Sequence, residues 1–202
     1  PSNTYIATWL AISSVGATIV PVEPNMDTFN IDETKIKEAI TARTKLILVV
    51  HLYGRPCKMS TIMDIASEFG LFVMEDNAQA QGALSDLGKT AGIGHINATS
   101  FYPGKNFGAF GDAGMITTND YALFQRCLEL RNYGSSVKYI HKIKGLNSRL
   151  DEVQAAILLK KFKYLDGWNA ARKNISLKYR ALLADQVFIP EWDDGSVWHI
   201  FP

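Results

Sequence analysis

Short apolar or β-branched runs alternate with amphipathic segments along most of the chain. The runs predict buried strands, and they lie at residues 17–22, 46–50, 71–74 and 115–118. Apolar positions three or four residues apart predict helices at residues 5–15, 32–40, 59–69 and 120–132. The repeated order of strand, helix and strand predicts a mainly parallel sheet that is covered by helices on both faces.

The pattern changes in the last third of the chain. From Leu150 to Leu182, apolar residues recur at steps of three, four and seven, which predicts one long or once-kinked amphipathic helix. We expect this helix to start at residues 147–151 and to bend at Gly167. Its apolar stripe is expected to pack on the core or on a partner chain.

Composition narrows the classes of function. With 202 residues, a formal net charge of +1 and no apolar run of transmembrane length, the chain is typical of an ordinary globular protein, without a membrane partner. The basic stretch at residues 138–144 is typical of a solvated loop, so we expect no nucleic-acid partner.

The cysteines and histidines lack metal-ligand spacing, so no metal site is expected, and free thiols fit a reducing compartment. The chain begins without methionine or a signal sequence and stops inside an aromatic run, so we expect an excerpt from a longer protein.

Lys105 is the candidate nucleophile. It lies in a segment that prolines and glycines keep irregular, close in sequence to Phe101, Tyr102, Phe107 and Phe110. Aromatic surroundings remove water from an ammonium group and favour the neutral amine, which is the form that makes a Schiff base. The alternative is a loop lysine that extends into water.

Asp76 is the candidate carboxylate partner. It follows the apolar run 71–74, so it lies at the strand ends where open α/β sheets bind ligands. Pyridoxal phosphate needs a lysine for its aldehyde and an anion beside its ring nitrogen, and Lys105 and Asp76 supply this pair. Asp76 could instead cap a helix. His51 follows run 46–50 at the same edge, and we interpret it as a core or loop histidine.

Three segments resemble the DegT-type (DegT/DnrJ/EryC/StrS) sugar aminotransferases, most closely the transaminases of dTDP-3-keto-6-deoxyhexoses. They are residues 75–82, residues 99–106 with 111–114, and residues 145–156. The resemblance implies a fold-type I, pyridoxal 5'-phosphate-dependent transferase of the α/β class, with a mainly parallel or mixed sheet between helices in three layers, α/β/α. It also implies that residues 1–185 are the central part of the large domain, without its N-terminal segment, and that residues 186–202 begin the smaller C-terminal domain.

The resemblance implies roles for four residues besides the catalytic pair of Lys105 and Asp76. Tyr5 would stack on the cofactor ring, or else pack in the core. Gln79 would reach the 3-oxygen side of the ring and Ser100 would bind the cofactor phosphate, unless each side chain bonds nearby backbone instead. Asn147 would reach the cofactor phosphate of a neighbouring subunit, or else cap a helix.

The activity implied is transfer of an amino group from an amino acid, expected to be glutamate, to a nucleotide-linked keto sugar. Such amino sugars enter cell-surface polysaccharides or secondary metabolites. The implied enzyme is a cytoplasmic homodimer with shared active sites. From the basic stretch 138–144 itself comes a further hypothesis, that Lys138 and Lys142 meet the substrate diphosphate across a subunit boundary. Three alternatives stay open: transfer at C4 as in perosamine formation, a sugar dehydrase, against which Lys105 argues because such relatives carry histidine there, and a non-catalytic regulator on the same fold.

Overall fold

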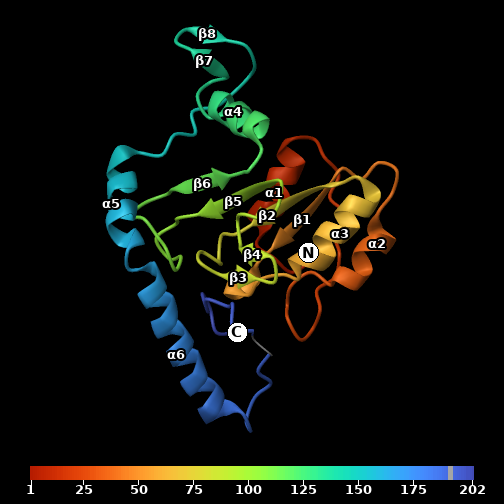
Figure 1. Cartoon of the computed structure of the whole chain (residues 1–202), viewed down its shortest axis with the longest axis vertical. Helices are drawn as coiled ribbons and strands as arrows, with labels where there is room; N and C mark the ends of the chain where they lie inside the picture. Colours follow the sequence, from red (N-terminus) through yellow and green to blue (C-terminus); the bar gives the residue numbers. More distant parts are fainter. Residues whose placement is uncertain (191–192) are drawn as a thin grey trace.

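Four strands form the central sheet of the computed structural model, which describes residues 1–190 and 193–202 (Figure 1). In spatial order they are β1 (Leu46–Val50), β2 (Phe72–Asp76), β5 (Ile96–Ser100) and β6 (Gly114–Thr117). The first three are parallel, and β6 is antiparallel to β5. Since Asp76 pairs with both Val50 and Ala98, the carboxyl ends of the parallel strands meet at one edge of the sheet.

Helices cover both faces of the sheet, which confirms the predicted α/β class. On one face, α3 (Met59–Phe69) and α2 (Ile36–Ala39) pack against alternate residues of β1 and β2 in a core that includes Val49 and Val73. On the other face, α1 (Ile6–Ser14) reaches Asp76 through Thr8. Successive strand residues point to opposite faces, so β2 serves both layers.

The remaining elements extend the molecule at two ends (Figure 1). One end carries α4 (Tyr121–Leu130), β7 (Ser135–Val137) and β8 (Ile140–His141), and the other carries α6 (Leu165–Leu183), which follows α5 (Glu152–Phe162). The short elements are η1 (Glu33–Lys35), η2 (Leu52–Gly54), β3 (Leu84–Ser85) and β4 (Gly88–Lys89).

Two predictions about secondary structure are wrong. Residues 17–22 form no strand, because a strand needs a hydrogen-bonded neighbour and none of the described strands pairs with this run. They line an apolar groove of about 490 Å³ beside α1, α2 and β1. The long helix starts at Glu152 rather than at residues 147–151, and it breaks at Lys163 and Tyr164 rather than at Gly167.

The position of the break follows from packing. Leu165 is buried against Phe107 and Leu158, and Tyr164 stacks on Trp168 with ring centroids 5.8 Å apart. These contacts redirect the chain at Tyr164, whereas Gly167 lies inside α6, where no close neighbour requires a glycine.

Residues 195–200 follow the predicted domain boundary in the sequence, yet they pack against residues of the predicted large domain. Val197 donates its N–H to the carbonyl of Gly54 and packs with Ala80 and Ala83. The boundary between residues 185 and 186 stays a prediction, and residues 191–192 lie outside the described residues. No helix in the described part of the chain is long and apolar enough to cross a membrane.

Candidate active site

Asp76 is held firmly at the carboxyl edge of the sheet. It ends β2, where the strand period directs its side chain toward α1. Its Oδ1 accepts a hydrogen bond from the N–H of Ala78 at 3.0 Å, and its Oδ2 accepts one from the hydroxyl of Thr8 at 2.7 Å. The carboxylate is therefore fixed from two elements of the fold.

Lys105 lies at the same edge, in a turn that is closed by a hydrogen bond from its own N–H to the carbonyl of Tyr102. Burial lowers the pKa of the Lys105 amine, and the nearby Asp76 carboxylate raises it by a smaller amount. The structure therefore brings together the two residues that the sequence predicts as the catalytic pair. Phe101 and Phe107 are buried beside the turn, whereas Tyr102 and Phe110 are exposed, so half of the expected aromatic shield is present.

Buried amides support the lysine turn from behind. The Nδ2 group of Asn106 donates to the carbonyl of Gln81 at 3.0 Å and to Oδ1 of Asn169 on α6 at 3.1 Å. Gly108 closes the turn, where a β-carbon would lie 2.5 Å from the carbonyl oxygen of Pro103. Only glycine fits such a close approach, so the backbone shape around Lys105 is strongly determined.

Ser100 makes the local backbone contact predicted as its alternative, whereas Gln79 bonds backbone 26 residues away rather than nearby. The Oγ of Ser100 accepts from the N–H of Tyr102 at 3.2 Å, and Oε1 of Gln79 accepts from the N–H of Tyr53. The hydroxyl hydrogen of Ser100 and the amide hydrogens of Gln79 take no part in these two bonds. Their roles toward a cofactor stay predictions.

Tyr5 and Asn147 differ in their relation to this edge. Tyr5 is 74% exposed at the start of α1, one helical turn before Thr8, so packing in the core is the wrong alternative. Asn147 is exposed and pairs through its backbone with Asn132 beyond α4, and no described contact joins it to Lys105 or Asp76. It does not cap α5, whose N-cap residue is Asp151.

A buried hydrogen-bonded pair, His51 and Glu75, lies behind Asp76. His51 is fully buried, as a core histidine should be, and its Nδ1 accepts from the N–H of Cys57, so its Nε2 carries the hydrogen that Glu75 accepts at 2.9 Å. Burial raises the pKa of the Glu75 carboxyl, but the bonds from His51 and from the N–H groups of Gly94 and Ile93 lower it below its usual value. Glu75 therefore stays charged and ties three segments together. The sequence prediction missed Glu75, although its place directly after the apolar run 71–74 was a signal.

His199 and Thr4 are two further residues that the sequence prediction missed. Burial lowers the pKa of His199 to about 4, with smaller contributions from Lys105 and Arg172, which places an uncharged imidazole near the lysine. Its Nδ1 is buried without a partner, as is the hydroxyl of Thr4 just before α1. No local pattern could have shown either, because both depend on distant parts of the chain.

This set of groups fits the predicted cofactor, pyridoxal phosphate. A half-buried amine of lowered pKa can bond to an aldehyde, and a fixed carboxylate can hold a proton on a ring nitrogen. The orphaned Thr4 hydroxyl before the N-terminus of α1 would find its acceptor in a phosphate. Among the described residues, no cluster of three or more histidine, cysteine or acidic side chains could hold a metal ion.

Comparison with known proteins gives a consistent match over the whole chain. A model of the DegT/DnrJ/EryC1/StrS aminotransferase family matches residues 1–202. A dTDP-3-amino-3,6-dideoxy-alpha-D-galactopyranose transaminase of Aneurinibacillus thermoaerophilus is 52% identical over 204 residues, covering 100% of this chain and 56% of that protein. The erythromycin biosynthesis sensory transduction protein EryC1 of Saccharopolyspora erythraea is 49% identical over 207 residues, covering 100% of this chain and 56% of that protein.

A solved structure agrees with this match. The structure of ntda from Bacillus subtilis with bound cofactor pmp superimposes with a TM-score of 0.92 at 40% sequence identity, covering 100% of this chain and 47% of that one. The chain spans about half the length of the curated relatives that it matches.

Proposed function

The chain belongs to the DegT/DnrJ/EryC1/StrS aminotransferase family, and we propose that the whole protein moves an amino group from an amino acid to a nucleotide-linked keto sugar. The proposed donor is glutamate and the proposed acceptor is a dTDP-3-keto-6-deoxyhexose. The name of the A. thermoaerophilus relative, a 3-amino-3,6-dideoxy sugar transaminase, supports amination at C3. The products would serve cell-surface polysaccharide or secondary-metabolite synthesis.

One observation carries the proposal: a desolvated lysine and a fixed carboxylate meet at the strand ends. Burial lowers the pKa of Lys105, and the smaller opposing effect of Asp76 shows that the two charges are close. This arrangement suits pyridoxal 5'-phosphate, whose amine form, pmp, is bound in the B. subtilis relative. Bound there, the cofactor would supply an aldehyde that captures amines and a ring that accepts electrons.

In the proposed reaction, each residue has a task that its surroundings favour. Lys105 Nζ would hold the cofactor through its aldehyde, and binding of the donor amine would free the lysine amine. The neutral amine then accepts the proton from the α-carbon of glutamate, which its lowered pKa makes easier. In the second half of the reaction it returns a proton to the sugar carbon that receives nitrogen. Asp76 keeps the proton on the ring nitrogen throughout.

The proposed assembly is a cytoplasmic homodimer in which Asn147 completes the partner's site. Its support is the exposure of Asn147 at a distance from the strand-end cluster, and the free thiols Cys57 and Cys127 fit a reducing compartment. Mixing Lys105→Ala protein with Asn147→Ala protein tests the sharing of sites. Because one of the two sites in a mixed dimer would be intact, activity should rise on mixing, and unchanged activity contradicts the proposal.

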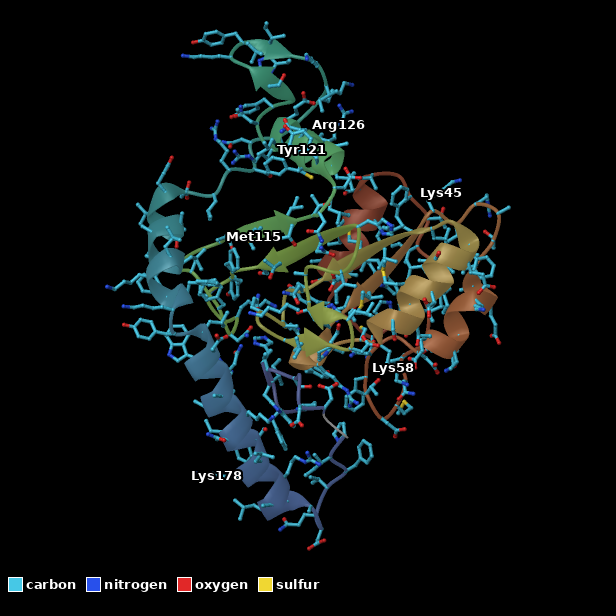
Figure 2. All side chains as sticks on the ribbon, viewed as in Figure 1. Lys45, Lys58, Met115, Tyr121, Arg126 and Lys178 are labelled. Carbon is cyan, nitrogen blue, oxygen red and sulfur yellow. The ribbon has the colours of Figure 1, made fainter. Side chains whose placement is uncertain are left out.

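The direct test of function uses the whole protein with pyridoxal phosphate. Wild-type protein should give a visible absorption band that borohydride fixes on Lys105, and glutamate should bleach the band. Lys105→Ala should give no covalent band, whereas Lys178→Ala, which removes an exposed lysine of α6, should behave like wild type (Figure 2). Addition of dTDP-3-keto and dTDP-4-keto sugars then shows which substrate restores the band.

A regulator on the same fold is the second candidate, because EryC1 is named a sensory transduction protein. The same spectra separate the two functions. A regulator without catalysis would leave the band unbleached by glutamate, or would show no band in wild type and in Lys105→Ala alike.

A further inference from the structure

Helix α1 buries a single side chain, and that side chain is polar. Thr8 is 9% exposed, whereas Ile6 and Leu10 on the same helix are more than half exposed. A helix that packed only for apolar burial would present its aliphatic residues instead. At the strand edge, α1 therefore contributes a hydrogen-bonding group, the Thr8 hydroxyl, while Trp9 and Ile12 of the same helix are half-buried in the groove that residues 17–22 also line.

The hydroxyl makes a short bond to the candidate site. It donates to Oδ2 of Asp76 at 2.7 Å, while the N–H of Ala78 holds Oδ1 at 3.0 Å. The Ala78 bond comes from the residue two positions along the chain, so by itself it leaves the carboxylate free to pivot. The Thr8 bond comes from 68 residues away, and it fixes the second oxygen. Hydrogen bonds to charged groups are the strong ones, so this bond can select one orientation.

The same turn of α1 carries a predicted cofactor contact. The N–H of Thr8 bonds to the carbonyl of Tyr5 at 3.2 Å, so the two residues lie one helical turn apart. The bond from Thr8 to Asp76 thus links the position of Tyr5 to the end of β2.

We infer that Thr8 is a positioning residue, which holds the Asp76 carboxylate in the orientation needed to keep a proton on the cofactor ring nitrogen; this inference rests on the proposed function. Thr8 touches neither substrate nor cofactor in this role. It acts through Asp76, because a carboxylate that can pivot would hold that proton less well than one whose two oxygens are both fixed.

The test compares Thr8→Val, which removes the hydroxyl at constant shape, with Thr8→Ser, which keeps it. The whole protein is loaded with ¹⁵N-labelled pyridoxal phosphate, and the nitrogen resonance reports ring protonation without any turnover. Thr8→Val should shift the resonance toward the unprotonated ring and lower kcat about tenfold, with the KM for glutamate within about twofold of wild type. Thr8→Ser should match wild type. Ser13→Ala is the control, because its hydroxyl on the same helix bonds only to the carbonyl of Leu10 in the described structure.

The outcomes separate this inference from the proposed function. If wild type forms no covalent adduct at Lys105, the proposed function fails. If wild type forms the adduct and Thr8→Val keeps both the wild-type resonance and the wild-type kcat, the inference about Thr8 is overturned, even when the melting temperature of the variant falls.

Discussion

Candidate residues are held in opposite ways at two places in the molecule. One place is the carboxyl edge of the sheet, and the other is the end formed by α4, β7 and β8. At the edge, Asp76 and Glu75 are held by bonds from several elements. At the other end, Lys138, Lys142 and Asn147 are exposed. Figure 2 shows Tyr121 and Arg126 on α4, apart from the sheet that carries Met115. Residues fixed by their own chain can be tested without a partner, whereas the roles proposed for the exposed ones need a substrate or a second chain.

The largest effect should come from the buried pair at the edge. His51→Leu leaves the buried Glu75 carboxylate without one donor and the Cys57 N–H without its acceptor. Because each buried group left unpaired costs roughly 1–3 kcal/mol, the free energy of unfolding should fall by about 2–5 kcal/mol. Lys37→Ala removes an exposed pair with Glu68 and should cost less than about 1 kcal/mol. Urea unfolding of the whole protein measures both, and equal losses would contradict the contrast between the two kinds of pair.

Asp76→Asn should act on catalysis rather than on stability. Without the negative charge at Oδ1 and Oδ2, the ring nitrogen loses its partner, and kcat should fall about 10²- to 10³-fold. Asp64→Asn, which changes an exposed carboxylate of α3, is the control and should leave kcat unchanged. Steady-state assays with glutamate and keto sugar measure kcat for both variants. A fall in kcat of less than about tenfold in Asp76→Asn would contradict the proposed role of Asp76.

A smaller effect should appear in the reactivity of Lys105 itself. Because Asp76 raises the pKa of Lys105 against the larger lowering by burial, Asp76→Asn should lower this pKa further and increase the neutral fraction near pH 8. Acetic anhydride labelling of the cofactor-free protein, followed by mass spectrometry, should then modify Lys105 several-fold faster. The exposed Lys178 serves as internal standard, and an unchanged ratio would show that the two charges do not interact.

The smallest effect is expected at the exposed end. Lys138 and Lys142 have no described ion pair, so the double substitution to alanine should leave stability unchanged and raise the KM for sugar nucleotide about threefold to tenfold at low salt. The rise should shrink as salt increases, since exposed charges are screened. Lys160→Ala on α5 is the matched control. An unchanged KM in the double variant excludes this loop from the substrate diphosphate.

Sequence reasoning succeeded where a local pattern determines the outcome. Met59–Phe69 is a helix with the predicted bounds, and Gly70 closes it in the left-handed conformation with φ of 62°. The strand Leu46–Val50 also has its predicted bounds, and the parallel order of the strands brought Asp76 to the edge where Lys105 lies. In these cases the chain period and the sheet topology are enough.

The failures share one physical cause, which is dependence on distant neighbours. Residues 17–22 have the composition of a strand, but without a pairing strand among the described residues they stay irregular. The helix break at Tyr164 follows from the packing of Leu165, and the bond of Thr8 to Asp76 spans 68 residues. No window of sequence contains both members of such contacts, so no local pattern could predict them.

The alternation of Glu75 and Asp76 on β2 limits how this protein can change in length. Glu75 points toward α3 and His51, and Asp76 points toward α1 and Lys105. Deleting or inserting one residue within Phe72–Asp76 would exchange the two faces and send each carboxylate into the wrong layer. Libraries of insertions and deletions should therefore recover variants in the exposed turn at Ala42 and Arg43, but none within β2.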